Sequence, residues 1–244
     1  MRKFGLLGKD ISYSFSRTYF KKKFQNLDID ATYDNFDVPK VDDFKLLLEK
    51  NEELEGLNVT IPYKEQIIPF LDTIHPIASE IGAVNTIKIS KNGQLAGYNT
   101  DYFGFTESIK PFLKKQHTKA LILGTGGASK AVAYSLKSMG ISSVYVSRKP
   151  SKNAISYAQL SEEILKDYTV IINCTPLGTS PKTAEFPAIP VEHLTPQHLV
   201  YDLIYNPAET RLMKFASEKG ATTTNGLRML ELQAERAWEI WNHS

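Results

Sequence analysis

Residues 119–131 of this chain read KALILGTGGASKA. Three apolar residues of strand character, 121–123, run directly into a glycine-rich turn, and a pattern typical of a helix follows as far as Gly140. The next apolar stretch is SVYV (143–146), so the order is strand, turn, helix, strand. In that context a glycine turn can bind a dinucleotide, because glycines let the backbone approach a pyrophosphate and the helix N-terminus offers unpaired N–H groups.

The turn therefore predicts a cofactor site at its five residues, Gly124, Thr125, Gly126, Gly127 and Ala128. A tight strand-to-helix turn with no ligand is the alternative, and Ser129 stands where the fingerprint usually has glycine or alanine.

The second strand of this unit ends in Ser147, Arg148 and Lys149. An NAD site usually places an acid there to bind the ribose hydroxyl, whereas two cations suit a 2′-phosphate. The guanidinium of Arg148 can also stack on an adenine face. We therefore expect NADP as the cofactor, with an ordinary solvated basic turn as the alternative.

Strands and helices alternate along the whole chain. The strand-like runs lie near 2–7, 31–38, 56–60, 84–89, 94–98, 119–123, 143–146, 169–173 and 199–203, with a hairpin turn at Asn92-Gly93. Helical runs lie near 16–26, 40–50, 63–74 and 101–115. Such alternation predicts an α/β fold with a mostly parallel sheet. The last helix carries an apolar stripe that we expect to dock on an earlier part of the chain: Leu227, Leu230, Ala234, Ala237, Trp238 and Trp241.

Length and composition exclude several classes of protein. At about 150 residues per domain, the 244 residues make one to two domains. The formal net charge of +2 argues against nucleic-acid or membrane partners. Cys174 is the only cysteine, so no intrachain disulfide can form, and the first residues do not resemble a signal peptide; both fit a cytoplasmic location. The five histidines show no metal-ligand spacing, so we expect no metal.

Polar residues stand at successive strand and helix ends in the first half. Thr60 and Lys64 follow the run at 56–60, at the edge where α/β proteins place their ligands. Asp101 follows another strand and Asn85 lies within one. Each has an ordinary alternative: Lys64 can be a surface lysine and Asp101 a helix cap. Together they offer ammonium, hydroxyl, amide and carboxylate groups, which suit a small polyhydroxylated acid. Ser14 and Ser16, before the first helix, add two more hydroxyls or are caps themselves.

Several motifs in a fixed order support a family resemblance. They are Ser14-Phe15-Ser16 (SxS), Asn58–Lys64 (NVTxPxK), Gly82–Thr86 (GAVNT), Asn99–Asp101 (NTD), Gly124–Ala131 (GxGGAxxA), Asn173–Gly178 (NxTxxG), Asp202–Thr210 (DxxYxPxxT) and Gly226–Ala234 (GLGMLxxQA). Over nearly its whole length the sequence resembles the shikimate dehydrogenase family. The resemblance implies reversible reduction of 3-dehydroshikimate to shikimate by NADPH, in aromatic amino-acid biosynthesis.

The resemblance also implies two domains and a role for each site residue. Residues 1–100, completed by 227–244, form the substrate domain, and residues 101–226 form a Rossmann-type NADP domain. Lys64 and Asp101 are the catalytic pair. Ser14, Ser16 and Tyr205 hold the substrate carboxylate, while Thr60, Asn85, Asp101 and Gln233 bind the ring hydroxyls. Leu203, Gly226 and Met229 line the nicotinamide.

The sequence departs from the family at four positions. Arg17 stands where the family has a proline after SxS, and Arg228 stands at the second glycine of GLGM. In the family's Asn-Arg-Thr cofactor loop, Ser147 replaces the asparagine and Lys149 replaces the threonine. These departures keep open a broader enzyme that accepts quinate or NAD. A non-catalytic NADP-binding sensor is a remote alternative, since Lys64 and Asp101 are both present. A monomer or a homodimer is equally compatible with the sequence.

Overall fold

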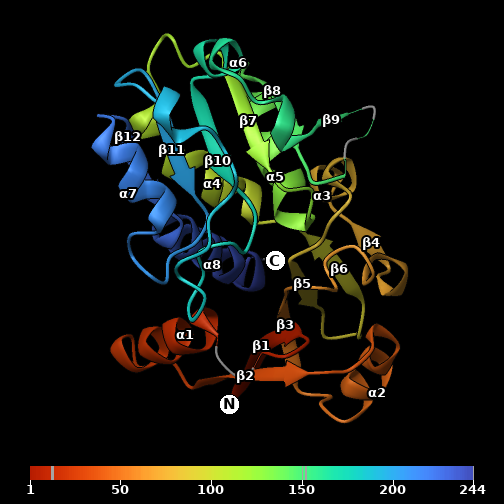
Figure 1. The fold of residues 1–244 in the computed structure, drawn as a ribbon. Helices are drawn as coiled ribbons and strands as arrows, with labels where there is room; N and C mark the ends of the chain where they lie inside the picture. The colour runs from red at the N-terminus through yellow and green to blue at the C-terminus, as the bar shows by residue number, and fades with distance from the viewer. Residues whose placement is uncertain (12–13, 150, 152, 244) are drawn as a thin grey trace. The chain divides into compact units, whose positions relative to one another are not determined.

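The computed structural model describes all residues except 12–13, 150, 152 and 244 (Figure 1). The chain divides into two compact units, which are Met1–Phe103 with Leu230–Ser244, and Gly104–Met229. Within the described ranges, none of the helices combines the length and the apolar character needed to cross a membrane.

The first unit is built on a six-stranded mixed sheet of order β2-β1-β3-β5-β6-β4. Its strands are β1 (Arg2–Gly8), β2 (Ala31–Asp37), β3 (Leu54–Val59), β4 (Thr73–Ile74), β5 (Thr86–Ile89) and β6 (Leu95–Tyr98). β1 pairs in parallel with both β2 and β3, whereas β5 is antiparallel to β3 and β6. Because Leu7 and Val59 are partners in the parallel register, β1 and β3 end at the same edge, and Thr60 donates its N–H to the Leu7 carbonyl there at 2.9 Å.

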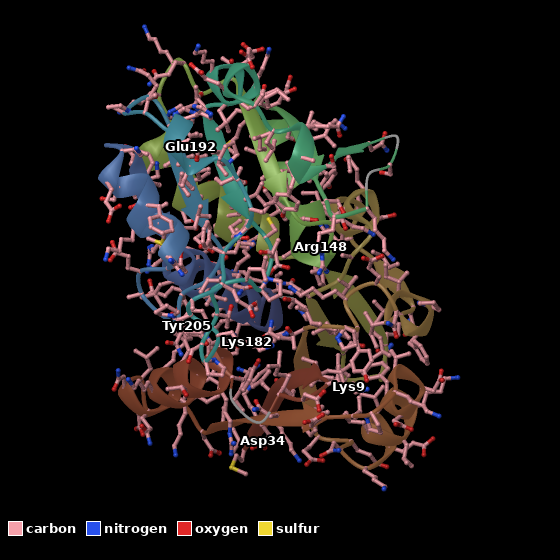
Figure 2. The ribbon with its side chains drawn as sticks, viewed as in Figure 1. Lys9, Asp34, Arg148, Lys182, Glu192 and Tyr205 are labelled. Carbon is pink, nitrogen blue, oxygen red and sulfur yellow. The ribbon has the colours of Figure 1, made fainter. Side chains whose placement is uncertain are left out.

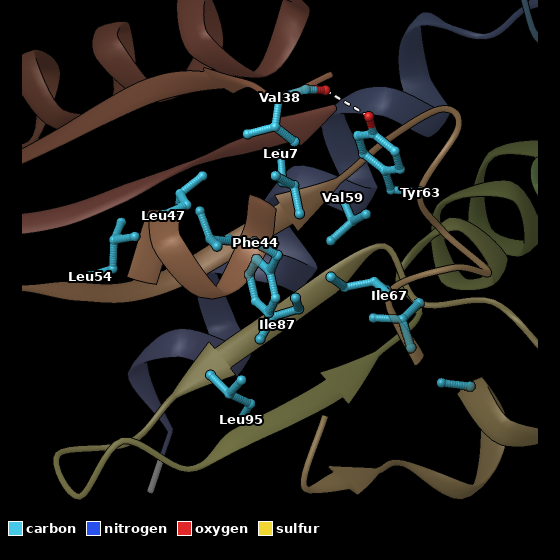
Figure 3. Packing of buried hydrophobic residues seen from close by; sticks show 13 residues of the cluster. Leu7, Val38, Phe44, Leu47, Leu54, Val59, Tyr63, Ile67, Ile87 and Leu95 are labelled. Atoms are coloured by element: carbon cyan, nitrogen blue, oxygen red, sulfur yellow. Dashed lines mark hydrogen bonds between the residues drawn. The ribbon is translucent and has the colours of Figure 1, made fainter. Parts of the chain in front are cut away.

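Three helices complete the N-terminal part of this unit: α1 (Phe15–Asn26), α2 (Phe44–Glu49) and α3 (Pro76–Ile81). One core cluster joins α2 to the sheet, with Phe44 and Leu57 fully buried (Figure 3). In the same cluster the Tyr63 hydroxyl donates to the Val38 carbonyl at 2.6 Å, which fixes the turn that precedes Lys64.

The last helix, α8 (Leu227–Asn242), supplies Ala234, Ala237 and Trp241 to a second core cluster of this unit, with Phe4 of β1 and Phe20 of α1. The Trp241 indole donates to the Ile87 carbonyl at 3.0 Å and lies where any side chain on Gly56 would clash with it. The expectation that the last helix docks on an earlier part of the chain is therefore confirmed.

The second unit has a six-stranded, wholly parallel sheet of order β12-β11-β10-β7-β8-β9. Its strands are β7 (Lys119–Leu123), β8 (Ser142–Val146), β9 (Ala154–Ile155), β10 (Val170–Asn173), β11 (Leu199–Asp202) and β12 (Thr222–Asn225). Its helices are α4 (Asp101–Ile109, whose first residues belong to the first unit), α5 (Gly127–Ser138), α6 (Glu162–Asp167) and α7 (Arg211–Glu218). Counted from β7, the strand order is 3-2-1-4-5-6, the doubly wound order of dinucleotide-binding folds.

Both faces of this sheet are buried, as the continuous apolar strands require. Ala120 and Ile122 belong to one core cluster, while Leu121 and Leu123 belong to the other. The predicted α/β class with a mostly parallel sheet is confirmed.

Some element predictions are wrong. The helix expected at 63–74 is instead a run of turns, one 3₁₀ turn at Ile68–Phe70 and the short strand β4. Pro69 lacks an N–H, so a regular helix cannot continue through it without losing a hydrogen bond. Pro111 likewise ends α4 early, within the 3₁₀ turn Lys110–Phe112. The other 3₁₀ turns are Val41–Asp43, Tyr157–Gln159 and Val191–His193. Leu227, expected in the buried stripe of the last helix, is 40% exposed.

His117, in the loop before β7, is 4% exposed. Its Nδ1 accepts the Lys114 backbone N–H at 3.0 Å, and its Nε2 lies 3.1 Å from the Gln197 carbonyl oxygen. These partners require a neutral ring with its hydrogen on Nε2. Burial lowers the pKa of His117; Lys114 and His198 act in the same direction, and the hydrogen bond to Gln197 opposes them.

The His117 pKa gives the first testable prediction, on stability. Because the folded-state pKa is below the ordinary value of 6.5, the stabilisation is complete above about pH 6.5 and is lost as the pH falls below it. Between about pH 7.5 and 5.5 the wild type should lose up to about 1 kcal/mol more of its free energy of unfolding than His117→Asn. Urea denaturation at the two pH values measures this, and equal losses would contradict it.

Candidate active site

Lys64 and Asp101 form an ion pair in the first unit. The Lys64 Nζ donates to Asp101 Oδ2 at 2.6 Å, and the two side chains are 14% and 3% exposed. Lys64 is held on its backbone as well, since its carbonyl accepts the Val84 N–H at 2.7 Å. A buried pair of this kind is costly to assemble, so it is weak evidence for a stabilising role. An ammonium with little solvent and one fixed partner is instead well placed to exchange a proton with a bound ligand.

Asn85 connects this pair to the last helix. Its Nδ2 lies 3.0 Å from Asp101 Oδ1 and 3.1 Å from Gln233 Oε1, and donates to both. Its Oδ1 accepts the Thr100 N–H at 2.6 Å, which fixes the direction of the carboxamide. Asp101 is therefore bound on both oxygens, by Lys64 and by Asn85. The first turn of α4 is capped by another residue, because the Asn99 side chain accepts the Tyr102 N–H at 3.3 Å.

Three other predicted substrate residues lie in the same unit. The Ser14 hydroxyl accepts the Arg17 N–H at 3.0 Å and caps α1, which leaves its own hydrogen available to a ligand. Ser16 lies in the first turn of α1. Thr60 follows β3 and is partly buried.

The sequence interpretation missed the polar groups that surround Asn85. The Tyr33 hydroxyl donates to Asn58 Oδ1 at 2.8 Å, and the Asn58 Nδ2 donates to Thr86 Oγ1 at 3.2 Å. Thr86 is fully buried and Asn58 is 9% exposed. A buried asparagine between the buried apolar residues Leu57 and Val59 was the available signal at position 58.

In the second unit, Gly124 follows β7 at the point where the strand order of the parallel sheet reverses, between β7 and β10. It has a φ of +101°, and a Cβ there would lie 3.1 Å from Thr175 Cγ2. Gly126 is the N-cap residue of α5, with open space around it and no capping side chain among the described residues. Ser129 is fully buried and donates to the Gly126 carbonyl at 2.6 Å, so a serine fits the third fingerprint position. The turn, with the exposed residues Thr125 and Gly126, fits a pyrophosphate.

The remaining predicted cofactor residues lie on three segments of the second unit, after β8, after β11 and after β12. Arg148 (Figure 2) and Lys149 follow β8 and are exposed. The Lys149 N–H donates to Ser147 Oγ at 3.2 Å. Gly226 packs so closely on the Leu203 carbonyl that no side chain fits there.

Met229 and Tyr205 differ in exposure. Met229 is 5% exposed within a core cluster, and Tyr205 is partly buried in the loop after β11. Among the described residues, no group of three potential ligands could hold a metal ion.

Asp202 organises the loop that carries Leu203 and Tyr205. Its carboxylate accepts from Thr210 Oγ1 at 2.7 Å, from Asn173 Nδ2 at 3.0 Å and from the Ile204 N–H at 3.1 Å. Burial raises the pKa of Asp202 to about 6, against the effect of these three donors. The motifs NxTxxG and DxxYxPxxT are thus hydrogen-bonded to each other through Asn173 and Asp202. These hydrogen bonds hold the loop after β11.

Comparisons with known proteins agree with this arrangement. A family model described as the shikimate dehydrogenase substrate binding domain matches residues 6–87. A shikimate dehydrogenase (NADP(+)) of Clostridium botulinum is 38% identical, over 97% of this chain and 95% of the relative. This chain belongs to the shikimate dehydrogenase family. The family predicted from the motifs is therefore confirmed.

Two solved structures extend the match. Shikimate 5-dehydrogenase of Thermus thermophilus, in complex with NADP(H) and shikimate, is 30% identical with a TM-score of 0.88, over 99% of this chain and 94% of that one. Quinate dehydrogenase of Corynebacterium glutamicum, in complex with NAD, is 27% identical with a TM-score of 0.88, over 99% of this chain and 93% of that one. The shikimate dehydrogenase fold therefore covers nearly the whole chain.

Proposed function

We propose that this chain catalyses the reversible oxidation of shikimate to 3-dehydroshikimate with NADP, in aromatic amino-acid biosynthesis. It is an oxidoreductase of the CH–OH class by its family. The observation that carries the residue assignment is the buried Lys64–Asp101 pair, with Asn85 and Gln233 attached to the same carboxylate. The Asn85 amide donates both to the Asp101 carboxylate and to Gln233. An ion pair with a purely structural role would not need this shared donor.

Lys64 is the proton donor and acceptor in this mechanism. Reduction of a ketone leaves an alkoxide, and the Lys64 ammonium gives it a proton; in oxidation the neutral amine takes the proton of the ring hydroxyl. Asp101 orients Lys64 and accepts a hydrogen bond from a substrate hydroxyl. NADP, when bound, supplies the hydride chemistry.

The polar groups divide between the two ends of the substrate. Ser14 and Ser16 donate hydroxyl hydrogens to the carboxylate, and Tyr205 is assigned to it by the family resemblance. Thr60, Asn85, Asp101 and Gln233 bind the ring hydroxyls. This division follows the chemistry of the groups. Hydroxyl donors suit the anionic carboxylate of the substrate. The ring hydroxyls both donate and accept, so they suit amides, which do the same, and a protein carboxylate, which accepts from them.

The second unit binds the cofactor. The N–H groups of residues 124–128 bind the pyrophosphate at the α5 N-terminus. Arg148 and Lys149 pair with the 2′-phosphate, with Ser147 supporting the turn. Leu203, Gly226 and Met229 lie at the nicotinamide end. A cytoplasmic monomer or homodimer is our prediction for the protein in the cell.

Steady-state kinetics with shikimate and quinate, each with NADP and NAD, test the proposal. We expect a kcat/KM for shikimate with NADP that exceeds the other three pairs. Comparable rates with quinate or NAD would assign the broader activity, which the similarity to the quinate dehydrogenase fold makes the second candidate. Binding of NADP without turnover of either substrate would leave a non-catalytic sensor.

Gln233 gives a prediction on substrate binding. Its Oε1 accepts from Asn85, and its own amide hydrogens remain for a ring hydroxyl. Gln233→Ala should raise KM for shikimate by about tenfold and leave KM for NADP unchanged. Glu239→Ala, which truncates an exposed polar side chain of the same helix, is the control and should leave both KM values unchanged. Unchanged kinetics in Gln233→Ala would show that Gln233 is an ordinary half-buried helix residue with no part in substrate binding.

A further inference from the structure

Tyr33 lies in β2, at the edge of the first unit's sheet, and is 5% exposed. Its ring stacks on Phe20 of α1, with the ring centroids 4.7 Å apart and the planes 14° apart. Trp241 of α8 lies on the same cluster, with its centroid 6.5 Å away. Packing on these two rings fixes the side chain, so the hydroxyl has one place to point.

That hydroxyl is the first donor in a chain of hydrogen bonds with a single direction. It donates to Asn58 Oδ1 at 2.8 Å. The Asn58 Nδ2 then donates to Thr86 Oγ1 at 3.2 Å and to the Asn85 carbonyl at 3.3 Å. The Thr86 hydroxyl in turn donates to Asn85 Oδ1 at 3.1 Å. Each group uses its oxygen for the previous donor and its hydrogen for the next acceptor.

The chain ends at the candidate catalytic carboxylate. With Asn85 Oδ1 occupied by the Thr86 hydroxyl and the Thr100 N–H, the Asn85 NH₂ must face Asp101 and Gln233. A reversed carboxamide would place an oxygen against the Asp101 carboxylate. Buried networks of this kind hold one arrangement only while each member keeps its partner.

We propose that Tyr33 is a positioning residue for the substrate: its hydroxyl holds the Asn58 amide in place and, through Asn58 and Thr86, supports the Asn85 carboxamide, whose direction the Thr100 N–H fixes. Asn85 and Gln233 thereby keep the donors and acceptors that they offer to the ring hydroxyls. This role rests on the proposed function. The network leads from Tyr33 to the amides that bind the ring, and it reaches Lys64 only through the Asp101 carboxylate. The effect of Tyr33 is therefore on substrate binding and not on proton transfer.

Tyr33→Phe tests this role because it removes the hydroxyl and keeps the ring stack. KM for shikimate should rise about three- to tenfold, the effect of one buried hydrogen bond. The value of kcat should stay within about twofold, and KM for NADP should not change. The matched control is Tyr201→Phe, which removes a buried hydroxyl that lies 2.7 Å from Ser108 Oγ in the core of the other unit. It should lower the thermal midpoint by a similar amount without raising KM for shikimate.

A second measurement uses the network itself. In an Asn58→Ala background, Tyr33→Phe should add no further change in KM, because the side chain that accepts from its hydroxyl is gone. A wild-type protein with no shikimate-dependent NADPH formation would refute the proposed function. An active wild type with equal KM for shikimate in Tyr33→Phe, or equal additional effects in both backgrounds, would overturn the Tyr33 proposal alone. So would a parallel loss of kcat and of affinity for both ligands, which is the signature of general destabilisation.

Discussion

Lys64→Ala should lower kcat for shikimate oxidation by about a thousandfold, the usual range for loss of a general acid–base group. The reason is geometric: the Lys64 Nζ donates directly to Asp101 at 2.6 Å, and both groups are nearly buried. The loss should be in kcat more than in KM, because ring-hydroxyl binding also uses Thr60, Asn85 and Gln233. Stopped-flow and steady-state rates with saturating NADP measure it.

Lys64→Arg is the control that separates charge from proton transfer. Removing the ammonium leaves the buried Asp101 carboxylate without its cation, which by itself costs about 3–5 kcal/mol of stability in buried pairs. An arginine keeps a positive partner for Asp101 but cannot release a proton at accessible pH. We therefore expect Lys64→Arg to be more stable than Lys64→Ala and still nearly inactive. Substantial turnover in Lys64→Arg would show that position 64 acts through charge alone.

The fold was predictable where local chemistry determines it. Gly124 needs a positive φ where it approaches Thr175, just after β10, so the turn identifies the first strand of a doubly wound sheet. Continuous apolar runs identify the central strands because both faces are covered. β12 was missed since its residues, Thr222–Asn225, are polar and half-buried at a sheet edge. The false helix at 63–74 came from counting apolar residues without giving Pro69 its full weight.

The sequence was sufficient to predict which residues and motifs form the site, but not which side chains hydrogen-bond to one another. Lys64 and Asp101 are 37 positions apart. Their contact depends on the sheet order that places β5 between β3, which precedes Lys64, and β6, which precedes Asp101. Tyr33 gave no signal, because an aromatic residue in a strand is ordinary packing. Its role is visible only from the direction of its hydroxyl, which is a tertiary property. The polar motif residues Asn173 and Asp202 were part of the resemblance, but their contact with each other emerges from the structure.

Arg148→Ala combined with Lys149→Ala should lower kcat/KM for NADP by about a hundredfold and leave the much lower activity with NAD nearly unchanged. Both side chains are exposed at the end of β8, so their removal should not disturb the core. A guanidinium and an ammonium on a 2′-phosphate make charge-assisted hydrogen bonds, each worth about 1.5–3 kcal/mol. The expected loss lies at the lower end of their sum, since exposed charges are screened by water and salt.

Lys219→Ala is the matched control, because it removes an exposed cation of the same unit at the end of α7. It should leave kcat/KM for NADP within about twofold, which separates a specific phosphate contact from the general effect of positive charge on an anionic cofactor. Each single variant should lose less than the double variant, and Arg148→Ala more than Lys149→Ala, because a guanidinium can bind phosphate through two N–H groups at once. Equal loss with NADP and NAD in the double variant would place the defect at the shared pyrophosphate or in folding, and the basis of NADP preference would then have to lie elsewhere than at the end of β8.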